Sequence, residues 1–366
     1  MERGRGGGQK SAAGLPFTPL SYSMGEGGRG GEGSLDVLSV GNFCVDLLVK
    51  PVRRLPEPGG LEIIDEYDLQ TGGCGNNCAI ALARLGLSVA TVGRVGDDRT
   101  GDIVLELLTA NGVRTDLMVR DRTARTSLSV VAVSDRGERS FLHHPGATLN
   151  LTAADVPAEA LSGARALHVG GTFLLPGLDG APMADLLRRA RAAGALTFVD
   201  TAVDGHGNRL EVVEPILPQV DFFLPSEAEA RGITGQDDPA AMAAFLLGRG
   251  VKAVCIKLGE QGCYVAGRSP HPLAPSPIPM GEGGPEGVEG SYVPAFSVVP
   301  VDTCGAGDTF TAGFIAGVLN GFDLAEAARM ANGVGAMCVT GLGATTAVGS
   351  WDQTLAFMAG TPTRAV

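Results

Sequence analysis

The stretch Val301-Asp302-Thr303-Cys304-Gly305-Ala306-Gly307-Asp308-Thr309-Phe310 lies near the C-terminal end of the chain and leads into the small and apolar residues of 311–319. Two glycines and an alanine leave the backbone nearly bare where we predict that a helix begins. The first N–H groups of a helix lack intrahelical partners, and the helix dipole adds about half a positive charge there. Such a helix start suits phosphate oxygens. Asp308 lies in the same first turn, where it can act as a carboxylate base or simply favour the dipole.

A second glycine-rich loop, Thr71–Asn77, runs into another predicted helix that ends near Gly86. Together with the Asp-Thr-x-Gly-Ala-Gly-Asp of residues 302–308, it resembles the two signatures of the ribokinase-like (PfkB) carbohydrate kinase family. The resemblance extends in order from about Leu35 to Ala347. It implies an α/β fold, a three-layer sandwich with a mostly parallel central sheet flanked by helices, plus a small β-lid.

The amino-acid composition argues against two classes of binding partner. The 366 residues carry a formal net charge of −12, which disfavours nucleic acid and anionic membranes. No apolar run is long enough to span a bilayer, and the N-terminus does not have the pattern of an export signal. The seven cysteines lack zinc-site spacing and indicate reduced thiols. We therefore expect a cytoplasmic protein with no nucleic-acid or membrane partner.

Short apolar runs alternate with helical stretches along most of the chain. The predicted strands are 35–40, 89–92, 166–169, 196–199, 222–224 and 253–256, with amphipathic helices such as 181–193 and 240–249 between several of them. This alternation is typical of a parallel sheet wrapped by helices, which binds ligands at the carboxyl edge of its strands.

Two regions depart from that rhythm. Residues 1–34 are dominated by glycine and are predicted to be a disordered tail, so that the kinase domain spans 35–366. Residues 268–291 are rich in proline and glycine and are predicted to be a solvent-exposed inserted loop. The tail contains Gly25-x-Gly27-x-x-Gly30, but a dinucleotide fingerprint should follow a strand, and this one precedes the first strand.

Segments 61–70, 126–134 and 139–143 alternate polar and apolar residues and are predicted to be strands. The resemblance implies that they belong to a β-lid over the sugar, formed by about 43–71 and 123–145. Such a lid can also pair between subunits. Because a small sheet exposes edges and an apolar face, association into a homodimer has a physical motive.

The resemblance also implies the chemistry, which is phosphoryl transfer from ATP to a hydroxymethyl group. Asp308 is implied to accept the hydroxyl proton, and the amides of Gly305, Ala306 and Gly307 to face the charge on the transferring group. A free aspartate is a weak base at neutral pH, so positioning must supply most of the acceleration. The sequence contains no Walker loop, which leaves this helix start as the predicted phosphate site.

The sugar site implied by the resemblance follows the first strand and the first glycine-rich loop. Its candidate residues are Asp46, Gly72, Gly73 and Asn77. Asp46 can accept two hydrogen bonds from vicinal hydroxyls, although an aspartate in a strand-to-loop turn is also common. Cys44 and Cys74 depart from the family pattern, and Cys74 stands where ribokinase has a lysine, which argues against ribose.

The implied nucleotide residues are Lys257, Gly259, Gly262, Thr303 and Asn332. Glu229 is implied to organise Mg²⁺ through water, although Ser226-x-x-Glu229 also has the spacing of a capping box. Asp302 and the Cys304 carbonyl match positions that hold a monovalent cation such as K⁺ in some relatives. Asp200 ends a predicted strand and can face metal-bound water.

We therefore predict an ATP-dependent kinase that phosphorylates a primary hydroxyl of a sugar or sugar-like substrate. A nucleoside kinase is an alternative, but only Phe43, Tyr67 and Phe141 are near enough to stack on a base. A kinase for a phosphorylated sugar would need a cation in the lid. Its candidates are Arg120, Arg122, Arg125 and Arg139. A catalytically silent sugar- or nucleotide-binding regulator is the third alternative, and a dehydrogenase is disfavoured.

Overall fold

The computed structural model describes residues 35–135, 139–202, 209–268 and 288–364. The predicted tail, 1–34, and most of the predicted inserted loop lie outside these residues. None of the helices within the described ranges is both long enough and apolar enough to cross a membrane.

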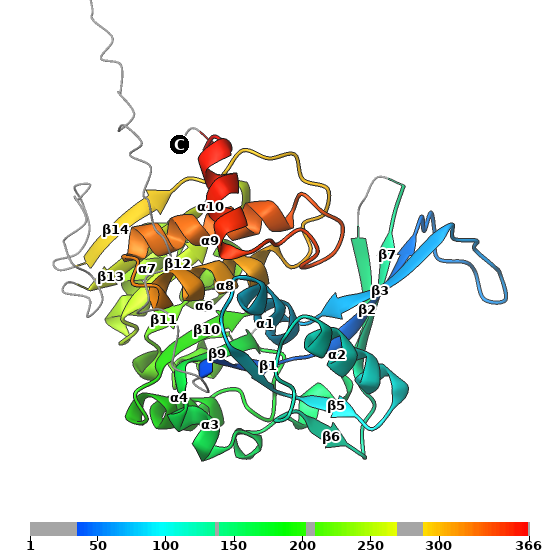
Figure 1. The fold of residues 1–366 in the computed structure, drawn as a ribbon, viewed down its shortest axis with the longest axis horizontal. Helices are drawn as coiled ribbons and strands as arrows, with labels where there is room; N and C mark the ends of the chain where they lie inside the picture. Colours follow the sequence, from blue (N-terminus) through cyan, green and yellow to red (C-terminus); the bar gives the residue numbers. More distant parts are fainter. Residues whose placement is uncertain (1–34, 136–138, 203–208, 269–287, 365–366) are drawn as a thin grey trace, which may run out of the picture.

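The elements alternate along the chain in the order expected of an α/β protein (Figure 1). The strands are β1 (Leu35–Gly41), β2 (Cys44–Lys50), β3 (Glu66–Gly72), β4 (Val89–Val92), β5 (Arg94–Gly96), β6 (Val119–Asp121), β7 (Ser127–Val133), β8 (Arg139–His144), β9 (Ala164–Thr172), β10 (Leu196–Thr201), β11 (Phe222–Phe223), β12 (Ala253–Lys257), β13 (Cys263–Arg268) and β14 (Val288–Val293). The helices are α1 (Cys74–Arg84), α2 (Arg99–Ala110), α3 (Ala158–Ser162), α4 (Ala181–Ala192), α5 (Arg209–Val213), α6 (Glu227–Thr234), α7 (Pro239–Gly248), α8 (Ala306–Leu319), α9 (Leu324–Cys338) and α10 (Trp351–Gly360).

The main sheet has eight strands in the order β14-β13-β12-β11-β10-β9-β1-β4. The six strands from β12 to β4 are parallel, and β13 and β14 extend the sheet antiparallel. All six strands predicted for the parallel sheet are confirmed. Every residue of β1 is buried, because helices cover both faces of a parallel sheet.

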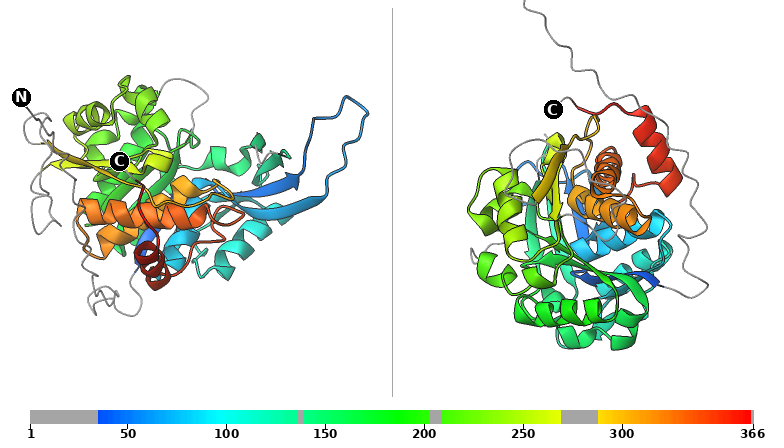
Figure 2. Two further views of the ribbon diagram at one scale, coloured as in Figure 1. Left: turned by 90° about the horizontal axis from the view of Figure 1, so that it is seen from above. Right: turned by 90° about the vertical axis from the view of Figure 1, so that its left-hand side faces the viewer.

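Two hydrophobic cores lie on opposite faces of this sheet. One packs the sheet against α1, α8 and α9, and the other packs it against α4, α6 and α7. Neighbouring strand residues alternate between them: Phe222 belongs to the first core and Phe223 to the second. This is the predicted three-layer sandwich, and Figure 2 shows its layers from two further sides.

Strands β3, β2, β7 and β8 form a separate four-stranded sheet that projects from one end of the molecule (Figures 1 and 2). We call it the lid. Its pairing register aligns Gln70, Asp46, Ser129 and His143 in one row across all four strands. Because side chains alternate between faces, the neighbouring row of Leu69, Leu47, Val130 and Leu142 lies on the other face. The row through Asp46 is therefore polar, whereas the opposite face, the apolar face of the lid, carries the row of leucine and valine side chains.

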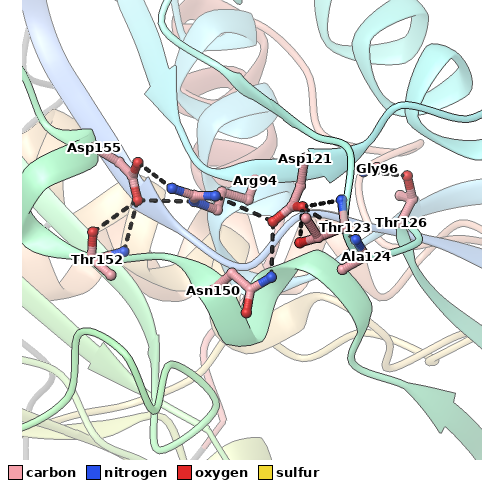
Figure 3. A network of polar contacts seen from close by, with 9 residues as sticks. All are labelled: Arg94, Gly96, Asp121, Thr123, Ala124, Thr126, Asn150, Thr152 and Asp155. Atoms are coloured by element: carbon pink, nitrogen blue, oxygen red, sulfur yellow. Dashed lines mark hydrogen bonds and ion pairs between the residues drawn. The ribbon is translucent and has the colours of Figure 1, made fainter.

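A polar network fixes the segment that leads into the lid strand β7 (Figure 3). Arg94 of β5 donates to Asp155 at 2.7 and 3.0 Å and to Asp121 at 3.2 Å. Asp121 also accepts from Thr123 and Asn150, and these hydrogen bonds hold the pKa of Asp121 well below its ordinary value. The carboxylate of Asp121 thus connects the segment before β7 to the core.

Two predicted boundaries differ from the structure. The strand expected over 61–70 begins only at Glu66 and continues to Gly72, because only these residues pair with β2. The inserted loop expected from residue 268 to 291 is shorter, since Arg268 pairs with Val288 and the β13–β14 ladder continues from there to Val293. Residues 269–287, the remainder of that loop, lie outside the described residues.

Candidate active site

Helix α8 begins at Ala306, as predicted, and Gly305 caps it in the left-handed region with φ 71°. A Cβ on Gly305 would lie 2.3 Å from the Ala344 carbonyl oxygen, so only glycine fits both this conformation and this contact. Among the amides of this helix start, that of Ala306 donates to Thr303 O at 3.4 Å, and that of Gly307 has no acceptor among the described residues.

Asp308 lies in that first turn, with Asn77 of α1 directly beside it. Asn77 Nδ2 donates to Asp308 Oδ2 at 2.8 Å, and the Cys74 thiol also hydrogen-bonds this carboxylate. Burial raises the pKa of Asp308 to about 6, and the nearby charge of Asp200 adds to the rise. The hydrogen bonds and Lys257 oppose that shift. An oriented carboxylate whose pKa lies closer to neutrality is a better general base than a free aspartate.

Lys257, at the end of β12, is the cation nearest this helix start. Its Nζ pairs with Asp200 Oδ1 at 2.6 Å, and Thr311 donates to the other oxygen of Asp200 at 2.8 Å. A Cβ on Gly307 would lie 3.5 Å from the same Nζ, so the ammonium lies against the first turn of α8. Desolvation alone would lower the pKa of Lys257, but Asp200 and Glu229 raise it above its ordinary value. Lys257 is therefore charged where phosphate oxygens would lie.

Glu229 makes the capping box that the sequence predicts. Its Oε2 accepts from Ser226 N at 2.8 Å, and its own N–H donates to Ser226 Oγ at 3.3 Å. Thr201 Oγ1 donates to the same Oε2 at 2.7 Å, which leaves Oε1 without a donor among the described residues. The described residues contain no group of three potential metal ligands. This donor set fits a Mg²⁺ ion held mainly by phosphate oxygens and water, with a carboxylate oxygen nearby.

On the lid side, Asp46 lies on β2, between β3 and β7. A Cβ on Gly72 would lie 2.1 Å from Asp46 Oδ1, so Gly72 lets the carboxylate lie over the backbone of β3. Burial raises the pKa of Asp46, against hydrogen bonds from Ser129 and Cys44. Gly73 has φ 92° and packs on the Asn42 carbonyl, which shapes the start of α1.

A cleft of about 340 Å³ lies on the other side of the α8 start. All five predicted nucleotide residues line it, together with Ala306 and Gly307. Asn332 also donates to the backbone oxygens of Val293 and Pro294 and so holds one wall in place. The structure thus brings the predicted nucleotide and catalytic residues together at one helix terminus.

Asp302 lies beneath this helix start. Its Oδ1 accepts from Cys304 N at 2.7 Å and its Oδ2 from Gly343 N at 2.7 Å. Arg139 of β8 forms an ion pair with Oδ1.

Sequence reasoning missed three residue pairs of the site and one side of the cleft. It did not pair Asn77 with Asp308, Lys257 with Asp200, or Arg139 with Asp302, because each pair joins residues that are distant in the sequence. It also missed the residues that line the largely apolar side of the cleft, which are Phe296, Val298, Phe310, Ala336 and Val339. The spacing of α8 and α9 could have pointed to Phe310 and Ala336, but nothing local marks the others.

Comparison with known proteins agrees with this geometry. A family model described as pfkB family carbohydrate kinase matches residues 34–351. The chain belongs to the PfkB carbohydrate kinase family. It is accordingly a carbohydrate kinase, as predicted.

Curated members of the family cover most of the chain. Fructokinase-1 of Zea mays is 30% identical over 326 residues, which are 84% of this chain and 93% of the maize protein. The 2-dehydro-3-deoxygluconokinase of Bacillus subtilis is 29% identical over 296 residues, which are 77% of this chain and 85% of the bacterial protein.

Solved structures confirm the ribokinase-like fold. A PfkB protein from Polaromonas sp. JS666 is 26% identical with a TM-score of 0.70, and covers 88% of this chain and 99% of its own. The Arabidopsis thaliana ribokinase complexed with ribose and ATP is 24% identical with a TM-score of 0.72, and covers 89% of this chain and 99% of its own. A putative ribokinase II from E. coli in complex with ATP and Mg²⁺ has a TM-score of 0.73 at 22% identity, and covers 89% of this chain and 99% of its own.

Proposed function

We propose that this carbohydrate kinase transfers the γ-phosphoryl group of ATP to a primary hydroxyl of a neutral sugar. One observation carries the proposal: Asp308 lies at a bare helix start, between an apolar cleft and the lid that carries Asp46. This arrangement places a base, an anion site and hydroxyl acceptors around one point.

In the proposed reaction, Asp308 accepts the proton of the sugar hydroxymethyl group. The oxygen forms a bond to the γ-phosphorus as the bond to the bridging oxygen of ADP breaks. The amides of Gly305, Ala306 and Gly307 face the charge on the transferring group, and Lys257 adds a fixed positive charge beside them. Asn77 keeps the carboxylate of Asp308 oriented.

Two solved relatives, both in complex with ATP, support ATP as the cosubstrate, and the E. coli protein, which also contains Mg²⁺, supports Mg²⁺ as the cofactor. When bound, Mg²⁺ would neutralise phosphate charge. Here Oε1 of Glu229 would accept hydrogen bonds from the water molecules that coordinate the ion. One oxygen of Asp200 accepts from Lys257 and the other from Thr311, so we assign Asp200 the role of positioning the lysine.

Buried polar atoms without a partner support a sugar site under the lid. Asn77 Oδ1 is a buried acceptor and Arg139 Nη1 a buried donor, and neither has a hydrogen-bond partner among the described residues. Such groups are rare in folded proteins and cost free energy when left unpaired. Sugar hydroxyls can both donate and accept, so one neutral ligand can satisfy both atoms and Asp46.

The charges favour a neutral sugar over an acidic one. Arg139 is paired with Asp302 and Arg120 with Asp102 at 2.6 Å, while Arg122 and Arg125 are exposed. An anionic substrate would therefore meet Asp46 with little free positive charge to offset it. Two of the three candidate aromatic residues do not favour a nucleoside either. Phe43 is fully buried in the core, and Tyr67 lies on the lid face opposite Asp46. Phe141 shares the face of Asp46, and adenosine is therefore included in the substrate panel below.

A substrate panel tests the proposal. We expect ADP release with ATP and Mg²⁺ to be fastest for a neutral sugar such as fructose. Values of kcat/KM for 2-dehydro-3-deoxygluconate, fructose 6-phosphate and adenosine should be lower by about tenfold or more, because an unpaired charge or a missing contact discriminates against them. A preference for any of these three would contradict the neutral-sugar assignment. Absence of ADP release with every substrate would favour the silent regulator.

We also propose that two chains associate through the apolar face of the lid. Its row of Leu69, Leu47, Val130 and Leu142 crosses all four strands, and Leu142 is 62% exposed. Light scattering should give the mass of two chains, and Leu142→Asp should shift the mass towards one. Leu149→Asp, an exposed leucine outside the lid, is the matched control. A wild-type mass of one chain over a wide concentration range would refute the lid interface.

A further inference from the structure

Asp302 is a buried carboxylate at the foot of the anion site, and only 3% of it is exposed. Both of its oxygens are occupied: Oδ1 accepts from Cys304 N and Oδ2 from Gly343 N, each at 2.7 Å. The charge of the carboxylate is balanced by Arg139, whose Nη2 pairs with Oδ1. The Arg139 side chain is itself largely enclosed, with 14% exposed. A buried pair of this kind is costly to separate, because either ion alone is left without compensation.

The monovalent cation implied by the family resemblance does not fit this arrangement. A cation bound to the Asp302 carboxylate would lie within a few ångströms of the guanidinium. Two like charges that close together repel each other strongly where little water screens them. The guanidinium of Arg139 already occupies the position beside Asp302 Oδ1.

We propose that Arg139 takes the place of a monovalent cation at Asp302 and thereby links the lid to the anion site. This inference concerns the same site as the proposed function and rests on it for its catalytic consequence. Arg139 acts through Asp302 and not on the transferred group, so it is a positioning residue.

The link passes from the lid to the helix start through two loops. Arg139 belongs to β8 of the lid, whereas Asp302 and Gly343 belong to the core. By accepting from Cys304 and Gly343, Asp302 joins the loop before α8 to the loop that contains Ala344. Gly305 packs directly against Ala344. The placement of the Gly305 backbone therefore depends on a carboxylate that a lid residue neutralises.

A second lid residue reaches the same loop. A Cβ on Gly343 would lie 2.4 Å from the side-chain oxygen of Gln70, and Gly343 itself has φ 96°. Gln70 and Arg139 thus contact the core at neighbouring points, one through Gly343 and the other through Asp302. The position of the lid on the core and the position of the α8 start are therefore coupled.

The first test compares wild-type enzyme in K⁺, Na⁺ and tetramethylammonium salts at constant ionic strength. We expect kcat and the melting temperature to be the same in all three, because the guanidinium already supplies the charge. Activation of the wild-type enzyme by K⁺ over tetramethylammonium by several-fold would overturn the proposal.

The second test removes the guanidinium. In tetramethylammonium, Arg139→Ala should lower kcat at saturating sugar by about 10- to 100-fold, less than the loss of about 10²–10³ on removing a donor of the anion site itself, because Arg139 acts through Asp302. K⁺ or low guanidinium should restore part of that loss, and K⁺ should raise the melting temperature of this variant only. Arg139→Lys keeps the charge and should need no added cation. Arg53→Ala is the matched control. Arg53 forms an exposed ion pair with Asp135 at 3.2 Å, and its loss should change none of these properties.

The readouts separate this inference from the proposed function. A purely sugar-binding role for Arg139 predicts a higher KM with unchanged kcat and no response to cations, and that result would overturn the proposal. So would a kcat loss that no cation relieves. If the wild-type enzyme phosphorylates no sugar, the proposed function fails. The cation-dependent melting temperature of Arg139→Ala still tests whether Arg139 replaces a cation at Asp302.

Discussion

Asp308→Asn is expected to lower kcat by about 10²–10⁴, the usual contribution of a positioned general base. Asparagine preserves the size of the side chain and can still contact Asn77, but it cannot accept the hydroxyl proton. ATP binding should change little, because the cleft is lined by other residues. Single-turnover phosphorylation and nucleotide titration on the same preparation measure both quantities. Asp352→Asn, at an exposed aspartate in the first turn of α10, is the matched control and should retain full activity. Near-normal turnover in Asp308→Asn would reject the assigned base.

The same carboxylate sets the pH dependence. Because burial raises the pKa of Asp308 to about 6, the base becomes protonated as pH falls through that value. Wild-type kcat should decrease about tenfold per pH unit below it. The raised pKa also means that ionised Asp308 destabilises the folded state above pH 6. Asp308→Asn should therefore increase the free energy of unfolding at pH 7.5 by about 1–3 kcal/mol. That gain should shrink as pH falls through 6 toward the ordinary pKa of 3.8.

Gly305→Ala should lower kcat by about 10²–10³, similar to the loss of one donor from an oxyanion hole. The new Cβ would lie 2.3 Å from the Ala344 carbonyl oxygen, and φ 71° is unfavourable for alanine. The loop must move, which carries the amides at the start of α8 away from the transferring group. Steady-state kinetics at saturating ATP and sugar measure the effect on turnover.

A second glycine separates backbone strain from catalysis. Gly235 caps α6 with φ 68°, and a Cβ there would meet no atom within 4 Å. Gly235→Ala should cost about 1–2 kcal/mol of stability from the left-handed conformation alone and leave kcat unchanged. If Gly305→Ala loses no more activity than Gly235→Ala, the amides of the α8 start do not stabilise the reaction.

Local patterns in the sequence were sufficient for much of the fold. The strand predicted over 89–92 is β4 residue for residue, and α8 begins where the Gly-Ala-Gly stretch indicates. Buried parallel strands and glycine-bearing helix starts depend on near neighbours in the chain, so their signals are local. The capping box at Ser226 and Glu229 was predicted for the same reason.

The pairs that make the site depend on the tertiary structure. Asn77 and Asp308 are 231 residues apart, and their contact exists only because α1 and α8 pack side by side against the same face of the sheet. The raised pKa of Asp308 likewise comes from burial, which no residue type specifies. The sequence by itself determined the family and the parallel sheet, and it predicted Asp308 as the base, since short-range motifs carry all three. Only the folded structure decided that Arg139 neutralises Asp302, because a buried charge finds its partner through packing across the molecule and not through proximity in the chain.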